Sequence, residues 1–195
     1  MKKKAVFIDR DGTINRDVGY PSSYEVIDIY PYSFEAVKKI KEAGLLAVII
    51  TNQSGIGRGI IEEESLHDIH AKLNEEFKRH HVSFDGIYYC PHYVFSKTEK
   101  FRKKCSCRKP NPGMGKRAAE DLNIDTSLSY MIGDKIEDLL FGININAAPI
   151  LVLTGYGKES QKKLKDMKIQ PAFVAKNLLE AAEWIIEQEK AASAS

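Results

Sequence analysis

Short apolar runs alternate with segments of helical periodicity along most of the chain. Residues 5–8 and 45–50 are continuously apolar, which is typical of parallel strands buried on both faces. Further strands are predicted at residues 84–89, 128–132, 150–153 and, in a shorter form, 172–174.

Between these runs, apolar residues recur at the spacing of one helix face. Ser33 is a predicted N-cap for the first helix, and Gly44 is predicted to end it. His67 and His70, in the longest helical segment, are expected to be solvated or to cap the helix. The apolar face of that segment is formed by Leu66, Ile69, Leu73 and Phe77. Later helices are predicted around residues 112–122, 136–143 and 178–186.

This alternation predicts an α/β fold with a doubly wound parallel sheet and helices on both faces. No internal repeat or linker interrupts it, so residues 1–190 are expected to form a single domain, with a disordered tail at residues 191–195. The pattern does not reveal the order of the strands. Because the intervals between motifs each hold about one strand–helix unit, no cap domain is expected.

Composition is that of an ordinary globular protein: 195 residues, 43% hydrophobic, 29% charged, with a net charge of +2. No apolar run approaches the ~20 residues of a membrane span. The first strand follows Met-Lys-Lys-Lys without a signal-peptide region, so a cytoplasmic protein with no membrane partner is expected. Three cysteines, an odd number, argue against a disulfide framework.

Two aspartates follow the first strand. Side chains alternate along a strand, so Asp9 and Asp11 are expected to point the same way beyond its carboxyl end. Gly12 would let the chain turn back, so that backbone N–H groups converge on an anion. Paired carboxylates beside such a nest suit phosphoryl transfer through an aspartyl-phosphate, with a divalent cation. The competing interpretation is an ordinary Asp-Gly turn.

Other polar residues also end predicted strands. Thr51 and Asn52 follow the second strand, Asp134 follows the fourth, and Lys109 precedes a helix. Taken singly, these residues fit a turn, an N-cap and a solvated cation equally well. Together they would lie at one edge of a parallel sheet, where open α/β folds bind their ligands.

A second group of residues has the spacing of metal ligands. Cys90 and His92 are separated by twelve residues from Cys105 and Cys107. Three cysteines and one histidine suit a closed tetrahedral Zn²⁺ site with a structural role. The alternative is three buried thiols beside an unrelated histidine. The same loop, residues 90–109, is strongly basic, which indicates an anionic partner.

The four motifs resemble those of the haloacid dehalogenase (HAD) superfamily of phosphatases. They are Asp9-Arg-Asp11-Gly-Thr13, Thr51-Asn52, Lys109 and Gly133-Asp134-Lys-Ile-Glu-Asp138. Within the superfamily the chain resembles the phosphatases that remove the 7-phosphate of a heptose 1,7-bisphosphate, in the histidinol-phosphatase-like branch. The stretches that carry this closer resemblance are residues 17–20, 51–59, 86–92, 105–110 and 133–135.

The resemblance implies a Rossmann-like core and a role for each motif residue. Asp9 would be the nucleophile, and Asp11 the general acid and then base. Thr51 and Lys109 would stabilise charge on the phosphoryl oxygens. The resemblance also implies Mg²⁺ held by Asp9, Asp134 and the backbone carbonyl of Asp11. Asp138, four residues after Asp134, is expected to support the site without binding the metal.

The expected substrate is a small sugar bisphosphate enclosed by loops of a monomer. Arg108 and Lys135 would recognise it beyond the reacting phosphate. The other residues expected to contact it are Asp17, Gly19, Tyr20, Asn52, Gln53, Ser54 and Arg58. A related alternative is a phosphatase of histidinol phosphate. An alternative of another class is a zinc-stabilised, non-catalytic binder of phosphorylated ligands or RNA, although the main expectation includes no nucleic acid.

Overall fold

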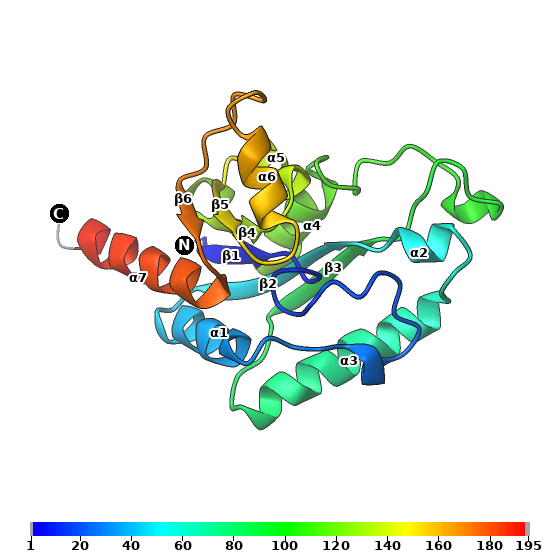
Figure 1. The fold of residues 1–195 in the computed structure, drawn as a ribbon. Helices are drawn as coiled ribbons and strands as arrows, with labels where there is room; N and C mark the ends of the chain where they lie inside the picture. The colour runs from blue at the N-terminus through cyan, green and yellow to red at the C-terminus, as the bar shows by residue number, and fades with distance from the viewer. Residues whose placement is uncertain (1, 194–195) are drawn as a thin grey trace.

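The computed structural model describes residues 2–193, which are built around a six-stranded sheet (Figure 1). The strands are β1 (Ala5–Ile8), β2 (Leu46–Asn52), β3 (Gly86–Cys90), β4 (Tyr130–Gly133), β5 (Ala148–Val152) and β6 (Phe173–Ala175). Their spatial order is β3-β2-β1-β4-β5-β6, and every neighbouring pair is parallel. The predicted doubly wound sheet is confirmed, and the structure supplies the strand order.

Helices connect successive strands. They are α1 (Tyr32–Glu42), α2 (Ser54–Gly57), α3 (Glu63–Arg79), α4 (Gly113–Leu122), α5 (Ile136–Asn144), α6 (Gly157–Lys163) and α7 (Leu178–Ser193). Single 3-10 turns lie at η1 (Tyr24–Val26), η2 (Glu99–Phe101) and η3 (Thr126–Leu128). Among the described residues, no helix combines the length and the apolar character needed to cross a membrane.

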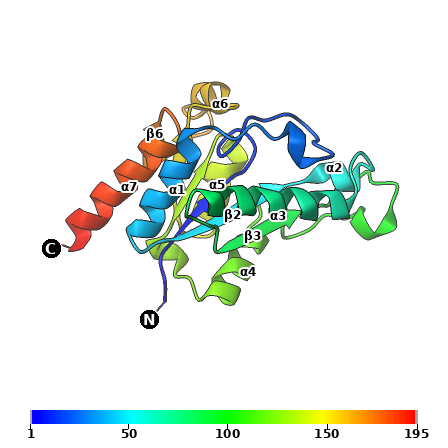
Figure 2. The same cartoon turned by 90° about the horizontal axis from the view of Figure 1, so that it is seen from below.

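Alternate residues of β1 belong to two different cores, one on each face of the sheet. Val6 and Ile8 pack in a cluster with residues of α1, α3 and α7. Ala5 and Phe7 pack in a second cluster with residues of α4 and α5. Figure 2 looks onto the first of these faces, with α1, α3 and α7 in front of the sheet. All four β1 side chains are fully buried, as the continuous apolar run predicts.

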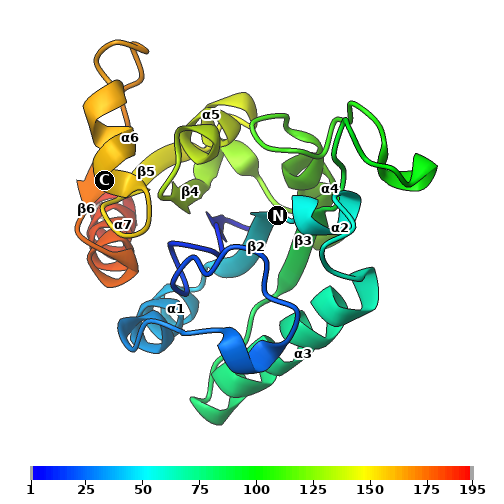
Figure 3. The same ribbon diagram turned by 45° about the vertical axis from the view of Figure 1, so that its right-hand side comes forward.

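The chain reverses its direction of winding at β1. It first adds β2 and β3 on one side, and then returns through α4 to place β4 on the other side of β1. Ligands of open α/β sheets bind beyond the carboxyl ends of the strands at such a switch point. The loop after β1, helix α2 and the loop between β3 and α4 gather at this edge (Figure 3).

Two local features differ from the expectation, and a third was not predicted. Ser33 does not cap α1; the helix begins at Tyr32, and the Ser33 hydroxyl donates to the backbone carbonyl of Ile14 at 2.8 Å. The glycine-rich segment after β2 forms the short helix α2 and lies close to the loop after β3, since a Cβ at Gly57 would meet the Pro91 carbonyl oxygen at 2.6 Å. Helix α7 includes residues 191–193 of the predicted tail, whereas 194–195 lie outside the described residues.

Candidate active site

The polar residues that end β1, β2 and β4 meet at one edge of the sheet because these three strands are neighbours. A cavity of about 710 Å³ lies at this edge; Asp9, Thr51, Asn52 and Lys135 line it, whereas Asp134 lies outside its lining. Of the residues predicted to act on or bind a substrate, all but Arg58 line it. The predicted residues that line the cavity are Asp9, Asp11, Asp17, Gly19, Tyr20, Thr51, Asn52, Gln53, Ser54, Arg108, Lys109 and Lys135.

Asp9 lies beside a buried cation. The Lys109 ammonium is 2.6 Å from Asp9 Oδ1 and 2.6 Å from Asp138 Oδ1, and it donates to the Ile50 carbonyl at 2.9 Å. Burial opposes the charge of Lys109, but Asp138 and Asp9 together raise its pKa. Burial raises the pKa of Asp9 to about 6 despite the nearby Lys109. This arrangement places a desolvated carboxylate next to a fixed positive charge.

Asn52 holds the backbone of Lys109 in place. Its Oδ1 accepts from the Lys109 N–H at 3.0 Å, and its Nδ2 donates to the Lys109 carbonyl at 3.2 Å. Asp138 holds the backbone of Lys135 in a similar way: its Oδ2 accepts from the Lys135 N–H at 2.9 Å. Both oxygens of Asp138 are therefore engaged with protein groups, as expected of a residue that supports the site.

Asp11 accepts hydrogen bonds from three side chains. Burial alone would raise its pKa, but the charge and hydrogen bonds of Arg10, with further hydrogen bonds from Asn15 and Gln53, lower it. Gln53 Nε2 donates to Asp11 Oδ2 at 2.9 Å and to Thr51 Oγ1 at 2.9 Å. In this structure Gln53 therefore connects two motif residues. Asp11 has the environment of an ionised carboxylate.

The turn after β1 differs from the expected nest of N–H groups. The Gly12 N–H bonds to the Asn15 carbonyl at 2.7 Å and is not free for an anion. Glycine is required at position 12 for two other reasons: its φ is +93°, and a Cβ would lie 2.3 Å from Asp134 Oδ2. The turn is thus shaped to bring Asp134 close to the backbone.

Asp134 has the properties of a metal ligand. Its Oδ1 is buried and has no hydrogen-bond partner in the part of the chain that the structure describes, while its Oδ2 accepts from the Tyr156 N–H at 2.7 Å. Burial, followed by the charges of Asp9 and Asp138, raises its pKa to about 8. Oxygen atoms of these three aspartates lie within 4.8 Å of one another. Such a group of hard oxygen donors fits Mg²⁺.

Two further cations line the cavity beyond Asp9. Lys135 Nζ lies 3.0 Å from Asp17 Oδ2 and 4.8 Å from the centre of the Tyr156 ring. Burial opposes its charge, but Asp9, Asp134 and Asp17 raise the pKa of Lys135. Arg108 is half-buried, and its Nη1 is a buried donor without a hydrogen-bond partner. A buried, unsatisfied guanidinium donor is costly unless a ligand satisfies it.

Arg58 lies outside the cavity, with its guanidinium carbon 3.9 Å from the centre of the Tyr93 ring. The cavity also contains residues that the sequence analysis did not identify: Pro110, Asn111, Glu137 and Tyr156. A signal was available for Tyr156, because it lies between two glycines just after β5, at the same edge of the sheet. Pro110 and Asn111 directly follow Lys109.

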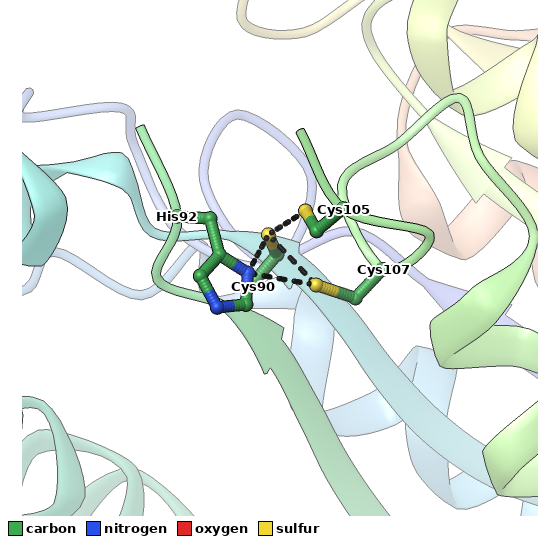
Figure 4. A group of neighbouring side chains, drawn as sticks. All are labelled: Cys90, His92, Cys105 and Cys107. Atoms are coloured by element: carbon green, nitrogen blue, oxygen red, sulfur yellow. Dashed lines mark hydrogen bonds between the residues drawn. The ribbon is translucent and has the colours of Figure 1, made fainter. Parts of the chain in front are cut away.

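The predicted zinc ligands come together at the end of β3, which Cys90 closes, and in the loop that follows it. The side chains of Cys90, His92, Cys105 and Cys107 converge on one point (Figure 4). Cys107 Sγ is 3.1 Å from Cys90 Sγ and 3.1 Å from His92 Nδ1, and Cys105 Sγ is 3.5 Å from Cys90 Sγ. These separations are too long for disulfides. A Cys₃His donor set converging in this way fits a tetrahedral metal ion.

The sequence pattern of a family described as HAD-hydrolase-like matches residues 106–181. Two relatives, both named D-glycero-beta-D-manno-heptose-1,7-bisphosphate 7-phosphatase, come from Pasteurella multocida and Escherichia coli K12. The first is 43% identical over 154 residues, covering 78% of this chain and 83% of the relative. The second is 41% identical over 152 residues, covering 77% and 80%.

A solved structure agrees with these relatives. The D,D-heptose 1,7-bisphosphate phosphatase from B. bronchiseptica, determined with magnesium and phosphate, matches with a TM-score of 0.83. Its sequence is 29% identical, and the match covers 95% of this chain and 99% of that one.

Proposed function

Because the chain belongs to the family of heptose-1,7-bisphosphate 7-phosphatases within the HAD-like hydrolases, we propose that it hydrolyses the 7-phosphate of D-glycero-β-D-manno-heptose 1,7-bisphosphate. The products are heptose 1-phosphate and inorganic phosphate. The β configuration rests on the names of the relatives. As a member of this family, the chain is a phosphoric monoester hydrolase.

One observation supports a bisphosphate, as opposed to a monophosphate, as the substrate. The cavity contains a reacting end, where Lys109 lies 2.6 Å from Asp9, and two more cations line the cavity beyond it. Among residues 2–193, Arg108 has a buried donor without a hydrogen-bond partner, and Asp17 is the only carboxylate within ion-pair distance of Lys135. A second phosphate of the substrate would satisfy both, and arginine can hold phosphate oxygens with two parallel hydrogen bonds.

In the first chemical step, a carboxylate oxygen of Asp9 attacks phosphorus and the bond from phosphorus to the C7 oxygen breaks. Asp11 is ionised in this site, so it must first take up a proton; it then gives this proton to the departing oxygen, and the sugar leaves as an alcohol. Lys109 and the hydroxyl of Thr51 stabilise the charge on the phosphoryl oxygens. The hydrogen of that hydroxyl can point at the substrate, because Gln53 donates to Thr51 Oγ1.

In the second step, water attacks the phosphorus of the aspartyl-phosphate on Asp9, and Asp11 takes a proton from this water. The closely spaced carboxylates of Asp9 and Asp134, with Asp134 Oδ1 unpartnered, support a Mg²⁺ that would be held by Asp9, Asp134 and the carbonyl oxygen of Asp11. When bound, Mg²⁺ neutralises charge on the phosphoryl group. Asp9 regains its carboxylate, and phosphate leaves.

We assign Zn²⁺ to the Cys₃His cluster on the chemistry of its ligands. The loop that carries these ligands has few buried apolar side chains of its own, and Arg108 and Lys109 follow Cys107 directly. A bound zinc would therefore fix two cavity cations relative to β3. Metal analysis of protein prepared without chelators tests this assignment, with one zinc per chain expected.

The substrate is tested by measuring phosphate release from the α and β heptose 1,7-bisphosphates and from histidinol phosphate. We expect the highest kcat/KM for the β-bisphosphate, and phosphorus NMR of the product should show that the 1-phosphate is retained. A higher kcat/KM for histidinol phosphate than for the β-bisphosphate would contradict the proposed substrate. Salt-dependent RNA binding without turnover of any ester would favour the binding-protein alternative.

The proposal describes a cytoplasmic, monomeric enzyme whose residues 1–190 act as one domain without a nucleic-acid partner. Support for the monomer comes from the cavity, which is lined by residues of one chain from several elements. Light scattering of the purified protein tests this part, with the mass of one 22.0 kDa chain expected.

A further inference from the structure

Arg10, the residue between the two motif aspartates, is completely buried and is the bulkiest fully buried side chain among the described residues. Its guanidinium carries a charge at every accessible pH. A buried charge without partners is very costly. The contacts that compensate Arg10 therefore indicate what this side chain does.

Arg10 makes a two-pronged contact with Asp11. Its Nε donates to Asp11 Oδ1 at 3.1 Å, and its Nη2 donates to Asp11 Oδ2 at 2.7 Å. Two parallel hydrogen bonds fix the plane of a carboxylate, which a single bond or a point charge does not. Arg10 thus restricts rotation of the proposed acid–base group.

Arg10 is held in turn by His70 of α3, whose Nε2 lies 3.1 Å from Arg10 Nη1. Arginine can only donate, so Nε2 of His70 accepts and its hydrogen is on Nδ1. Burial, followed by the charge of Arg10, lowers the pKa of His70 to about 3, which keeps the imidazole neutral and able to accept. A histidine predicted to be solvated or to cap the helix is instead 6% exposed and connects α3 to the active-site turn.

The remaining contacts of Asp11 show which of its oxygens faces the substrate. Asn15 Nδ2 donates to Oδ1 at 3.0 Å, and Gln53 Nε2 donates to Oδ2 at 2.9 Å. Among these donors only Gln53 lines the cavity. The Oδ2 atom on the Gln53 side is therefore the one that can exchange a proton with a substrate.

We propose that Arg10 and His70 form a positioning pair that holds Asp11 with Oδ2 toward the leaving oxygen of the substrate. Neither residue touches the reacting atoms. Their effect is exerted through Asp11, and it should appear only where proton donation by Asp11 matters. This inference rests on the proposed phosphatase mechanism but not on the identity of the sugar.

Two substrates with different leaving groups can distinguish a positioning role from a general loss of active-site structure. Expulsion of an alkoxide from a sugar phosphate needs the proton of Asp11, whereas p-nitrophenolate leaves without one. The kcat/KM value reports steps up to the release of the alcohol. It therefore depends on Asp11 as an acid for the sugar phosphate, and much less for p-nitrophenyl phosphate.

We would measure kcat/KM of His70→Leu on heptose 1,7-bisphosphate and on p-nitrophenyl phosphate. A general acid contributes about 10²–10⁴-fold, so partial misplacement of Asp11 should lower kcat/KM on the bisphosphate by about 10–100-fold and leave the aryl ester nearly unchanged. His70→Gln, whose amide oxygen can accept from Arg10, should recover most of the loss. Equal losses on both esters, or no loss, would overturn the proposal.

Two additional variants complete the test. Arg10→Lys keeps the charge but removes the two-pronged contact, so it should show the same selective loss and replaces His70→Leu if that variant does not fold. His67→Leu changes an exposed histidine of the same helix and should change neither ester. If the wild type cleaves p-nitrophenyl phosphate but not the heptose, the proposed substrate fails; the comparison then uses a sugar phosphate that the wild type does cleave.

Discussion

Lys109 is buried between two carboxylates, and its replacement by methionine should separate its structural role from its catalytic one. The side chain is 4% exposed, and its three hydrogens are directed to Asp9, Asp138 and the carbonyl of Ile50. Methionine has a similar length and no charge. The Lys109→Met variant therefore leaves Asp9 and Asp138 buried without their shared cation.

The expected loss of stability is large. At 2.6 Å, Coulomb's law with an effective dielectric constant of about 20 gives roughly 6 kcal/mol of attraction per pair, before the cost of desolvation. Removal of one partner from a buried pair typically costs about 3–5 kcal/mol in the free energy of unfolding. Asp138→Asn in the same background removes one of the two repelling carboxylates. The loss of unfolding free energy in the double variant should then be smaller, by at least about 1.5 kcal/mol, than the sum of the losses in Lys109→Met and Asp138→Asn alone.

Urea unfolding followed by circular dichroism, without added Mg²⁺, measures these free energies. Lys162→Met, on the exposed surface of α6, is the matched control and should change stability by less than about 0.5 kcal/mol. Turnover should be lost in Lys109→Met and should not return in the double variant, because the phosphoryl charge remains unmatched. Additive losses of stability, or normal turnover in Lys109→Met, would refute this account of the cation.

Four other expectations concern different parts of the molecule. Asp9→Asn should keep its circular dichroism spectrum and lose steady-state turnover, because an amide cannot form the acyl-phosphate; substantial activity would contradict the covalent route. Cys107→Ser should lose the bound zinc in metal analysis and expose residues 90–107 to proteolysis, since a structural zinc supplies local folding energy. Arg108→Ala should lower kcat/KM on the bisphosphate by the equivalent of about 1.5–3 kcal/mol but affect p-nitrophenyl phosphate much less; equal losses would defeat recognition of the second phosphate. The pKa of His70 is lowered to about 3 in the folded protein, so below about pH 6.5 the unfolded chain binds a proton that the folded protein excludes. The free energy of unfolding should therefore fall by up to about 1.4 kcal/mol per pH unit as the pH drops toward 4. Urea unfolding at several pH values should show a smaller dependence of this free energy on pH in His70→Gln.

The positions of the strands could be predicted from the sequence because each apolar run is followed by polar residues that mark its end. Buried parallel strands appear as continuous apolar runs, and the polar residues that follow them lie at a common edge. The order of the strands was not readable, because β1 is equally apolar toward both neighbours. Either neighbour could therefore pair with it on the evidence of composition alone.

Some contacts depend on which loop the fold brings near, and local sequence does not report this. Asn52 and Lys109 are far apart in the chain, yet Asn52 holds both backbone groups of Lys109. The family resemblance implies that Asn52 contacts the substrate. In the structure Asn52 lines the cavity, and its amide also holds the Lys109 backbone, a contact that the sequence did not predict.

His70 had a signal that was overlooked. It lies four residues after Leu66 and three before Leu73, on the face that the apolar residues define. A polar residue within an apolar face needs a buried partner. That partner, Arg10, follows directly after Asp9, so the position of His70 on the helix and the aspartate motif together contained the evidence for this contact.

The pairing of Asp9 with Asp11 was predicted from strand alternation, but it arises differently. Strand β1 ends at Ile8, so alternation does not extend to Asp11. Asp11 lies in a tight turn whose N–H groups at Thr13, Ile14 and Asn15 all bond to the Arg10 carbonyl. The same residue therefore organises the turn through its backbone and fixes the Asp11 carboxylate through its side chain. Substitution at position 10 should change the side-chain contact alone, which is why variants of Arg10 can test the positioning of Asp11 without removing the turn.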